Sequence, residues 1–135
     1  MRILSLDPGK TTGVVVFNST GIAAGSVQSS AQIPYDDAFT FLDGIIGEGL
    51  DAIVIERFVI SQRTLKNARV EETFDVIGAA KCLASLRGIP VYRQAASDAK
   101  TAYPDARIKD LGFAIVGRHA KDALRHALLF THKTL

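Results

Sequence analysis

The sequence predicts an α/β fold in which helices pack on a mixed β-sheet. Three short apolar segments separated by turn-forming residues come first in the chain, and this order is typical of an antiparallel meander. Apolar segments then alternate with stretches of helical spacing, and strands that are connected through helices run parallel to one another. Because 135 residues are enough to bury one core, we expect a single domain over residues 1–135.

Turn-forming residues set the limits of the first three expected strands. The first strand covers residues 2–7 and stops at a Pro-Gly pair, since proline and glycine interrupt a strand. A run of valines predicts the second strand at 13–17, and the third is expected at 22–27. Asn, Ser, Thr and Gly at 18–21 supply the turn between the second and third strands.

Helices and strands alternate in the rest of the chain. Apolar residues at helical spacing predict the longer helices, and continuous apolar runs predict the strands. In order, we expect a helix at 36–48, a strand at 52–56, a helix at 68–86, a strand at 91–93, two short helical pieces divided by Pro104 within 96–117, and a helix at 118–131. The run at 52–55 is apolar throughout, which indicates a central strand buried on both faces.

The composition excludes several classes of protein. No apolar run approaches the roughly 18 residues that span a bilayer, so we expect no membrane partner, and the first residues lack the pattern of a secretory signal. The single cysteine, Cys82, cannot form an internal disulfide, which fits a reducing cytoplasm. Its apolar helical surroundings predict that Cys82 is buried. The net charge of +2 is too small to indicate a nucleic-acid partner by itself.

Acidic residues end two of the most apolar predicted strands. Asp7 ends the first strand, and Glu56 follows the apolar run of the fourth. Charged side chains in such places are rarely buried unless they are paired or bind a metal, and the carboxyl ends of neighbouring strands meet at one edge of a sheet. The last helix adds His119 and Asp122, which lie on one face because they are three residues apart, and His126 continues that face.

Carboxylates that are brought together raise one another's pKa unless a cation compensates them. Hard divalent ions such as Mg²⁺ or Mn²⁺ suit oxygen ligands. One or two such ions would orient a water molecule and stabilise the leaving oxygen of a phosphodiester. We therefore interpret Asp7, Glu56 and Asp122, with His119, as a metal site for cutting nucleic acid; His119 would complete the coordination or shuttle protons.

Each of these residues also has an ordinary explanation. Asp7 could cap the turn at the Pro-Gly pair, and Glu56 could pair with Arg57 or Arg63. Asp122 could be a solvated residue of a helix that also carries basic side chains, and the histidines could be surface or near-core residues. Their joint arrangement is what favours the metal site.

Three motifs carry a resemblance to a known family. They are Ile3-Leu4-Ser5-Leu6-Asp7-Pro8-Gly9 with Thr12-Gly13, then Ile53-Val54-Ile55-Glu56, then His119-Ala120-Lys121-Asp122-Ala123-Leu124. In this order and spacing, nearly the whole chain resembles the RuvC-type Holliday junction resolvases of the ribonuclease H-like (retroviral integrase) superfamily. The opening motif also occurs in sugar-kinase and actin-like ATPases, whereas His-x-x-Asp-Ala on a terminal helix is more specific. The resemblance implies a ribonuclease H-like fold with a five-stranded sheet, a meander of three strands plus two parallel strands, and helices on both faces.

The resemblance also implies an activity and the residues for it. A homodimer would incise two strands of a four-way DNA junction with Mg²⁺, for which Mn²⁺ would substitute. The catalytic acids correspond to Asp7, Glu56 and Asp122; His119 stands where members carry His or Asp, and Lys100 resembles a lysine near the scissile phosphate. The short chain and the segment 98–105 look like bacteriophage members, which would work in the cytoplasm of a bacterium or a phage-infected bacterium.

Basic and polar side chains are candidates for contacts with DNA, because such groups supply most contacts to the phosphate backbone. The candidates are Lys10, Arg57, Phe58, Gln62, Arg63, Lys66, Asn67, Arg69 and Lys100. Phe58 departs from the family pattern: bacterial members carry an aromatic residue three positions beyond the second acid, whereas Phe58 is two positions beyond Glu56 and the third position is Val59. A core position for Phe58 is an equal alternative, and solvated surface is the alternative for the basic residues.

The helix at 68–86 has two apolar stripes. One stripe is Val70, Phe74, Ile77 and Ala84, and the other is Val76, Ala79, Leu83 and Leu86. One stripe covers the sheet, and the second predicts a surface for a homodimer. The alternative is a helix buried on both sides within one chain.

The leading hypothesis is a metal-dependent, structure-selective endodeoxyribonuclease for four-way junctions and other branched DNA. One alternative is a YqgF-like nuclease that acts on RNA. Another is a non-catalytic module that binds branched DNA, although the presence of all three acids argues against it. The chain is too short for an actin-like ATPase, which needs about twice this length for its paired domains, and its sequence shows no second phosphate loop.

Overall fold

The computed structural model describes residues 1–21, 24–47, 49–62 and 70–134. The strands are β1 Arg2–Asp7, β2 Thr11–Gly21, β3 Ala24–Pro34, β4 Ala52–Arg57 and β5 Val91–Ala95. The helices are α1 Tyr35–Ile46, α3 Val70–Leu86, α4 Ala96–Ala102, α5 Asp105–Asp110 and α6 Arg118–Thr134. Among the described residues, no helix has both the length and the apolar character needed to cross a lipid bilayer.

The five strands form one mixed sheet in the order β3-β2-β1-β4-β5. β1 pairs with β2 and β2 with β3 in antiparallel register, whereas β1 with β4 and β4 with β5 are parallel. The expected meander of three strands plus two parallel strands is therefore confirmed. β4 is buried on both faces, as its apolar run predicts, but β1 occupies the centre of the sheet.

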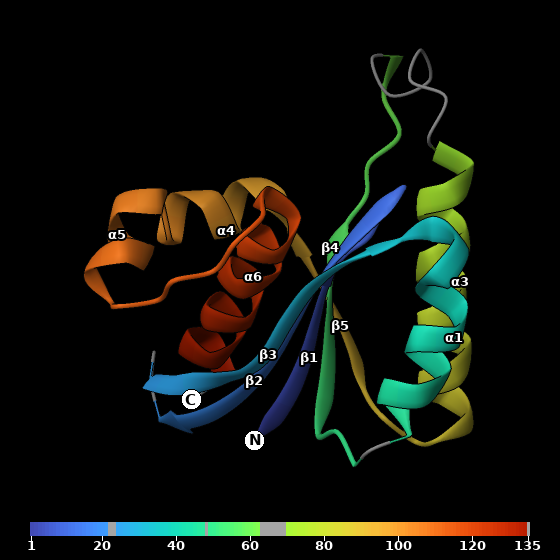
Figure 1. Ribbon diagram of the computed structural model, residues 1–135, viewed down its shortest axis with the longest axis horizontal. Coiled ribbons are helices and arrows are strands. Elements are labelled where there is room, and N and C mark those ends of the chain that lie inside the picture. The colour runs from blue at the N-terminus through green and yellow to red at the C-terminus, as the bar shows by residue number, and fades with distance from the viewer. Residues whose placement is uncertain (22–23, 48, 63–69, 135) are drawn as a thin grey trace.

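Helices cover both faces of the sheet (Figure 1). α1 and α3 pack on the face that carries Leu4, Leu6, Ile53 and Ile55. The other face contacts α6, with α4 and α5 beside it, through side chains such as Val15 and Phe17. Because successive residues of a strand point to opposite faces, each strand contributes alternately to the two cores. In β1 the odd-numbered residues, which include Asp7, therefore face α6. In β4 the even-numbered residues, which include Glu56, face α6.

The meander is longer than the sequence predicts. β2 continues through the turn expected at 18–21, and β3 extends to Pro34 through a stretch of Ser and Gln. β3 lies at the edge of the sheet, and several of its residues alternate between half-buried and exposed positions. An edge strand that covers the core with one face needs few apolar residues, so the search for apolar runs missed most of β3.

The face of α3 that packs on the sheet differs from both predicted stripes. Its buried residues are Thr73, Val76, Ile77, Ala80 and Ala84, a set that takes members from each stripe. Phe74 and Leu86 are exposed, at 41% and 78%. Cys82 is exposed as well, so the prediction that it is buried is wrong. Position 82 is two residues from both Ala80 and Ala84 and therefore lies on the opposite side of the helix.

Candidate active site

Asp7 is the last residue of β1, and Glu56 is the last but one of the neighbouring parallel strand β4. Leu6 of β1 stands opposite Ile55 of β4 in the register of the sheet, so the two acids that follow lie side by side. Strand alternation turns both side chains toward the face that carries α6. Asp7 is only 8% exposed, and Glu56 is half-buried. The ends of the strands thus bring two carboxylates under the first turns of α6.

Two histidines of α6 contact these acids. The Nδ1 atom of His119 lies 3.0 Å from Oδ2 of Asp7. Two helical turns further on, His126 places its Nε2 atom 3.1 Å from Oε2 of Glu56 and its Nδ1 atom 3.3 Å from Oε1 of Gln94 on β5. His126 is 1% exposed. Each strand-end carboxylate therefore has an imidazole from the same helix as its partner.

The third acid, Asp122, is held by Arg125. Arg125 donates from its guanidinium to Asp122 and to Asp105, and from Nε to the carbonyl oxygen of Tyr103 at 2.8 Å. Both Arg125 and Asp122 are buried, at 7% and 8% exposure. Lys100 of α4 lines a hollow together with Asp122, and its positive charge opposes the rise in the pKa of that acid.

Burial and mutual repulsion raise the pKa of two of the acids. Burial, followed by the charge of Glu56, raises the pKa of Asp7 from 3.8 to about 6, while the hydrogen bond and charge of His119 oppose the rise. Burial also raises the pKa of Asp122; Glu56 adds to this shift, and Lys100 and His119 oppose it. Glu56 and His119 are thus close enough to Asp7 and Asp122 to influence the ionisation of these two acids.

Close backbone packing fixes where α6 begins. Gly13 of β2 pairs with Asp7, and a Cβ atom at this glycine would lie 1.9 Å from the carbonyl oxygen of His119. Gln32 of β3 accepts a hydrogen bond from the backbone N–H of His119 at 2.9 Å. Gly117, directly before α6, has a φ of 99°, a conformation that favours glycine. The meander therefore sets the position of His119 against Asp7.

The donor set fits a hard divalent ion in its chemistry. Carboxylate oxygens are the ligands that such ions prefer, and a bound cation offsets repulsion of the kind that raises the pKa of Asp7. Within the described ranges, however, no three His, Cys, Asp or Glu side chains are oriented to hold one ion together. Asp7, Glu56 and Asp122 instead contact His119, His126 and Arg125. Binding an ion would require these carboxylates to turn from their basic partners.

The remaining predicted residues surround this site at different distances. Lys10 is exposed in the turn after β1, in a hollow that Tyr35 and Glu72 also line. Arg57 and Gln62 are exposed, whereas Phe58 is half-buried. The Phe58 ring packs edge-on against Phe74, with centroids 5.4 Å apart. These surroundings agree with the alternative that Phe58 is a core residue. The predicted DNA contacts Arg63, Lys66, Asn67 and Arg69 lie outside the described residues.

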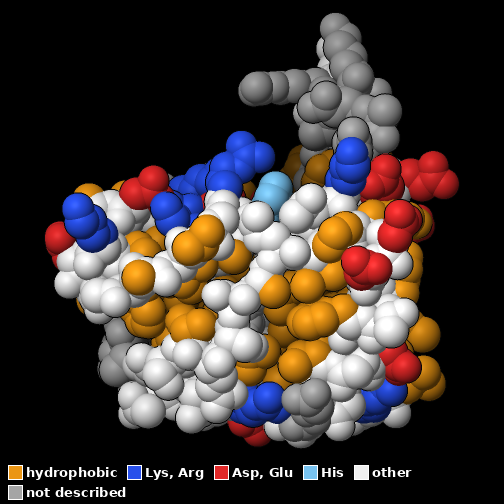
Figure 2. Space-filling model, viewed as in Figure 1, with side chains coloured by type: hydrophobic (Ala, Val, Ile, Leu, Met, Phe, Trp, Pro, Cys, Tyr) orange, Lys and Arg blue, Asp and Glu red, His pale blue; other side chains and the backbone are white. Residues whose placement is uncertain are grey.

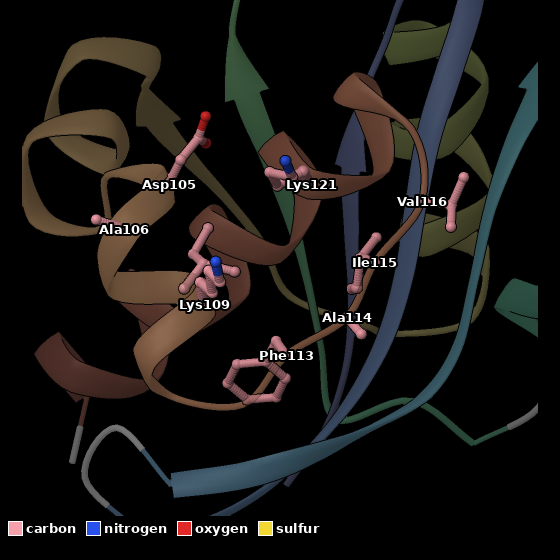
Figure 3. Close-up of a pocket in the computed structure, with 9 residues that line it drawn as sticks. Asp105, Ala106, Lys109, Phe113, Ala114, Ile115, Val116 and Lys121 are labelled. Carbon is pink, nitrogen blue, oxygen red and sulfur yellow. The ribbon is translucent and has the colours of Figure 1, made fainter.

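Two adjoining hollows lie beside α6, and Asp122 lines the first of them. The first, of about 490 Å³, is lined by basic side chains including Lys100, Arg118 and Lys121. The second has the same volume, about 490 Å³, and shares Asp105 and Lys121 with the first. Apolar side chains including Phe113 line it, and Figure 3 shows Phe113, Ile115 and Val116 on the segment that connects α5 to α6. On the molecular surface, blue basic side chains lie along the rim near a histidine, above an apolar area (Figure 2).

Sequence reasoning missed several residues of the site. The sequence indicates His126 only as continuing the face of His119 and Arg125 only as a basic residue of the last helix, and it gives no indication of Gln94 or Gln32. His126 lies seven residues after His119 on the same helix, so helical spacing could have indicated a second acid–histidine pair. The contacts of Arg125, Gln94 and Gln32 depend on how distant segments pack, and no local pattern reports them.

Comparisons with known proteins bear on the fold. The chain matches no protein-family model and no curated protein sequence. It is similar to the solved structure of Thermus thermophilus RuvC in complex with Holliday junction substrate, with a TM-score of 0.80 and 17% identity over 99% of this chain and 94% of that one. A fowlpox virus resolvase solved with Holliday junction DNA has a TM-score of 0.62 at 13% identity, covering 100% and 99% of the two chains. The yeast mitochondrial Holliday junction resolvase has a TM-score of 0.54 at 10% identity, covering 97% and 76%.

These likenesses span nearly the full length of the chain, at identities where only the fold is conserved. The chain therefore has the ribonuclease H-like fold of the RuvC-type and poxvirus resolvases, as expected from its motifs.

Proposed function

We propose that this protein is a metal-dependent endodeoxyribonuclease that hydrolyses phosphodiesters in four-way junctions and other branched DNA. The observation that carries the proposal is the meeting of Asp7, Glu56, Asp122 and His119 at the ends of β1 and β4. The similar structures are those of Holliday junction resolvases, two of them in complex with junction DNA, and this supports the choice of substrate. Basic side chains next to Asp122 suit a polyanion.

Asp7, Glu56 and Asp122, with His119, would hold one or two Mg²⁺ ions, and Mn²⁺ would substitute. When bound, such an ion supplies a Lewis acid that lowers the pKa of water and stabilises charge on the departing oxygen. The side chain of His119 is 33% exposed, and its Nδ1 atom is engaged by Asp7. When Asp7 turns to an ion, His119 would either complete the coordination or exchange a proton with the reacting groups. Lys100 would bind the phosphate beside Asp122.

Cleavage of labelled DNA tests the reaction, the metal and the substrate class together. Four-way, three-way, flap and linear DNA should be incubated with Mg²⁺, with Mn²⁺ and without a divalent ion. We expect cleavage of branched DNA only when an ion is present. Asp7→Asn should abolish cleavage and leave junction binding intact, because it removes a ligand charge without changing the shape of the site. The exposed Asp110 provides a matched control, and Asp110→Asn should cut normally.

Three outcomes would contradict the proposal in different ways. Full cleavage of the junction by Asp7→Asn would refute the assignment of the metal site. Binding of branched DNA without nicking under any metal condition would favour the non-catalytic module. Preferential cleavage of structured RNA in competition with junction DNA would favour the YqgF-like alternative.

The proposed active form is a homodimer through α3. Phe74, Gly78, Cys82 and Leu86 are all exposed and follow one another at intervals of four residues, so they form one stripe along the helix. A twofold partner would cover this stripe and present two sites to a twofold junction. Leu86→Glu should convert the dimer to a monomer in sedimentation, whereas Val116→Glu, at a position that is 92% exposed on another surface, should not. A monomeric wild type would contradict the dimer.

The segment 98–105 resembles bacteriophage members of the RuvC-type family, and we propose a phage source and a bacterial cytoplasmic setting on that resemblance.

A further inference from the structure

Two arginines stand side by side on the face of the sheet opposite the acids. Ile55 of β4 pairs with Arg93 of β5, and Arg57 follows Ile55 by two residues. Because side chains alternate along a strand, Arg57 and Arg93 point to the face that carries α1 and α3. Glu56 and Gln94 point to the α6 face, where His126 contacts both. The end of β4 thus carries an acid on one face and a pair of guanidinium groups on the other.

The arginine pair has no counter-ion in the described part of the chain. No salt bridge or hydrogen bond joins either guanidinium group to a described acidic side chain, and the buried Nε atom of Arg93 has no hydrogen-bond acceptor. Burial, together with the charge of Arg57, lowers the pKa of Arg93. A buried donor without an acceptor and a pair of like charges both destabilise a folded protein. The pair therefore makes no visible contribution to holding the fold together.

The arginine pair lies at the edge of the sheet, next to the candidate active site. β5 is the edge strand of the sheet, so this side of Arg93 has no further strand beyond it. Arg57 is exposed and immediately follows Glu56. The basic group of Lys100, Arg118 and Lys121 lies on the α6 face, on the far side of the acids from the arginine pair. Positive charge therefore flanks the candidate active site on both faces of the sheet.

We propose that Arg57 and Arg93 together bind one phosphate group of the DNA where it leaves the active site across the ends of β4 and β5. The DNA source of this phosphate rests on the proposed nuclease function. A guanidinium group donates two parallel hydrogen bonds to phosphate oxygens. One phosphate between the two arginines would offset their repulsion, and a small rotation of the Arg93 side chain would give its Nε atom an acceptor. A second phosphate contact on this face would fix the direction of the strand relative to Glu56.

Arginine-to-methionine variants test the proposal, because methionine keeps much of the aliphatic stem and removes the charge. Arg57→Met, Arg93→Met and the double variant should be compared with the wild type. Arg87→Met is the matched control: Arg87 is paired with Asp43 at 2.9 Å just beyond the opposite end of α3. Binding of a four-way junction should be measured at several salt concentrations in EDTA, and thermal unfolding should be measured in the same buffer.

Arg93→Met should weaken junction binding on the order of tenfold, the effect of one charge-assisted hydrogen-bonding contact. The double variant should lower the slope of log K against log salt by about one, as expected for one lost phosphate contact. Its loss of affinity should be smaller than the product of the two single losses, because both arginines hold the same group. The unfolding temperature of Arg93→Met should equal or exceed that of the wild type, and Arg87→Met should bind as the wild type does.

Three results would overturn this inference. The first is an unchanged affinity and salt slope in Arg93→Met. The second is a fall in its unfolding temperature that accompanies the lost binding, which would make Arg93 a structural residue. The third uses inorganic phosphate as a probe: if free phosphate stabilises the wild type but not Arg93→Met, while their junction affinities are equal, the site binds a small anion and not DNA.

The binding assay in EDTA separates this inference from the proposed nuclease. If no junction is ever cut but Arg93→Met still loses affinity and salt slope, the nuclease proposal fails and the phosphate site stands. If junctions are cut and Arg93→Met binds like the wild type, only the phosphate site fails.

Discussion

Replacing Asp7 by Asn should stabilise the metal-free protein while it destroys the proposed activity. Asp7 is 8% exposed, and burial with the nearby charge of Glu56 raises its pKa from 3.8 to about 6. An acid whose pKa is higher in the folded state than in the unfolded state holds its proton more tightly when folded. Ionising it at neutral pH therefore favours unfolding. Asparagine has nearly the same shape and never ionises.

The size of the effect follows from the two pKa values. A rise from 3.8 to about 6 is about two pKa units, which corresponds to roughly 3 kcal/mol at about 1.4 kcal/mol per unit. The folded protein binds more protons than the unfolded chain between these values, so the wild type loses stability relative to Asp7→Asn as pH rises from about 4 to about 6. Above that range the difference is constant. It corresponds to an unfolding temperature higher by roughly 10 °C in the variant, an upper limit because the buried amide also loses hydration.

Thermal unfolding in EDTA at pH 4, 5, 6, 7 and 8 measures this difference. The gap between Asp7→Asn and the wild type should widen up to about pH 6 and then level off. Asp110→Asn, at an exposed position, should show no such widening. Adding Mg²⁺ at pH 8 should raise the unfolding temperature of the wild type but not that of Asp7→Asn. A variant that is less stable than the wild type at pH 8, or a gap that does not change with pH, would refute the reasoning.

Further predictions concern the frame around the site. Gly13→Ala should reduce the free energy of unfolding by about 3 kcal/mol or more, since its Cβ atom would lie 1.9 Å from the His119 carbonyl oxygen. The control Gly44→Ala has no atom within 4 Å of the new Cβ atom and should raise the free energy of unfolding by about 0.5–1 kcal/mol. Chemical denaturation measures both changes. Gln32→Ala removes the acceptor of the His119 N–H and should lower stability by about 1 kcal/mol and slow cleavage; normal cleavage would show that this contact does not position the histidine. Lys100→Met removes the charge that opposes the rise in the pKa of Asp122, so the acidic limb of the cleavage–pH profile should move to higher pH. An acidic limb at the same pH as in the wild type would contradict this role of Lys100.

Local patterns predicted most of the fold. Apolar runs placed β1, β4 and β5, and helical spacing placed α1, α3 and α6 to within a few residues at their ends. They failed at β3, because an edge strand exposed on one face does not need an apolar run. They also failed on the orientation of α3. Its sequence has apolar residues on more than one side, so periodicity alone could not decide which side meets the sheet, and Cys82 was placed in the core by mistake.

The sequence by itself determined which chemical groups the site can use. Acids directly after apolar strands, and a histidine and an acid at helical spacing, were readable because strand ends and helix faces are short-range features. Only the tertiary structure decided how these groups are partnered. His119 meets Asp7 across 112 positions of the chain, and His126 meets Glu56 across 70. Such contacts depend on the packing of α6 against the sheet. The pairing of β4 with β5 brings Arg57 and Arg93 together without a described counter-ion, and no local pattern carries that information.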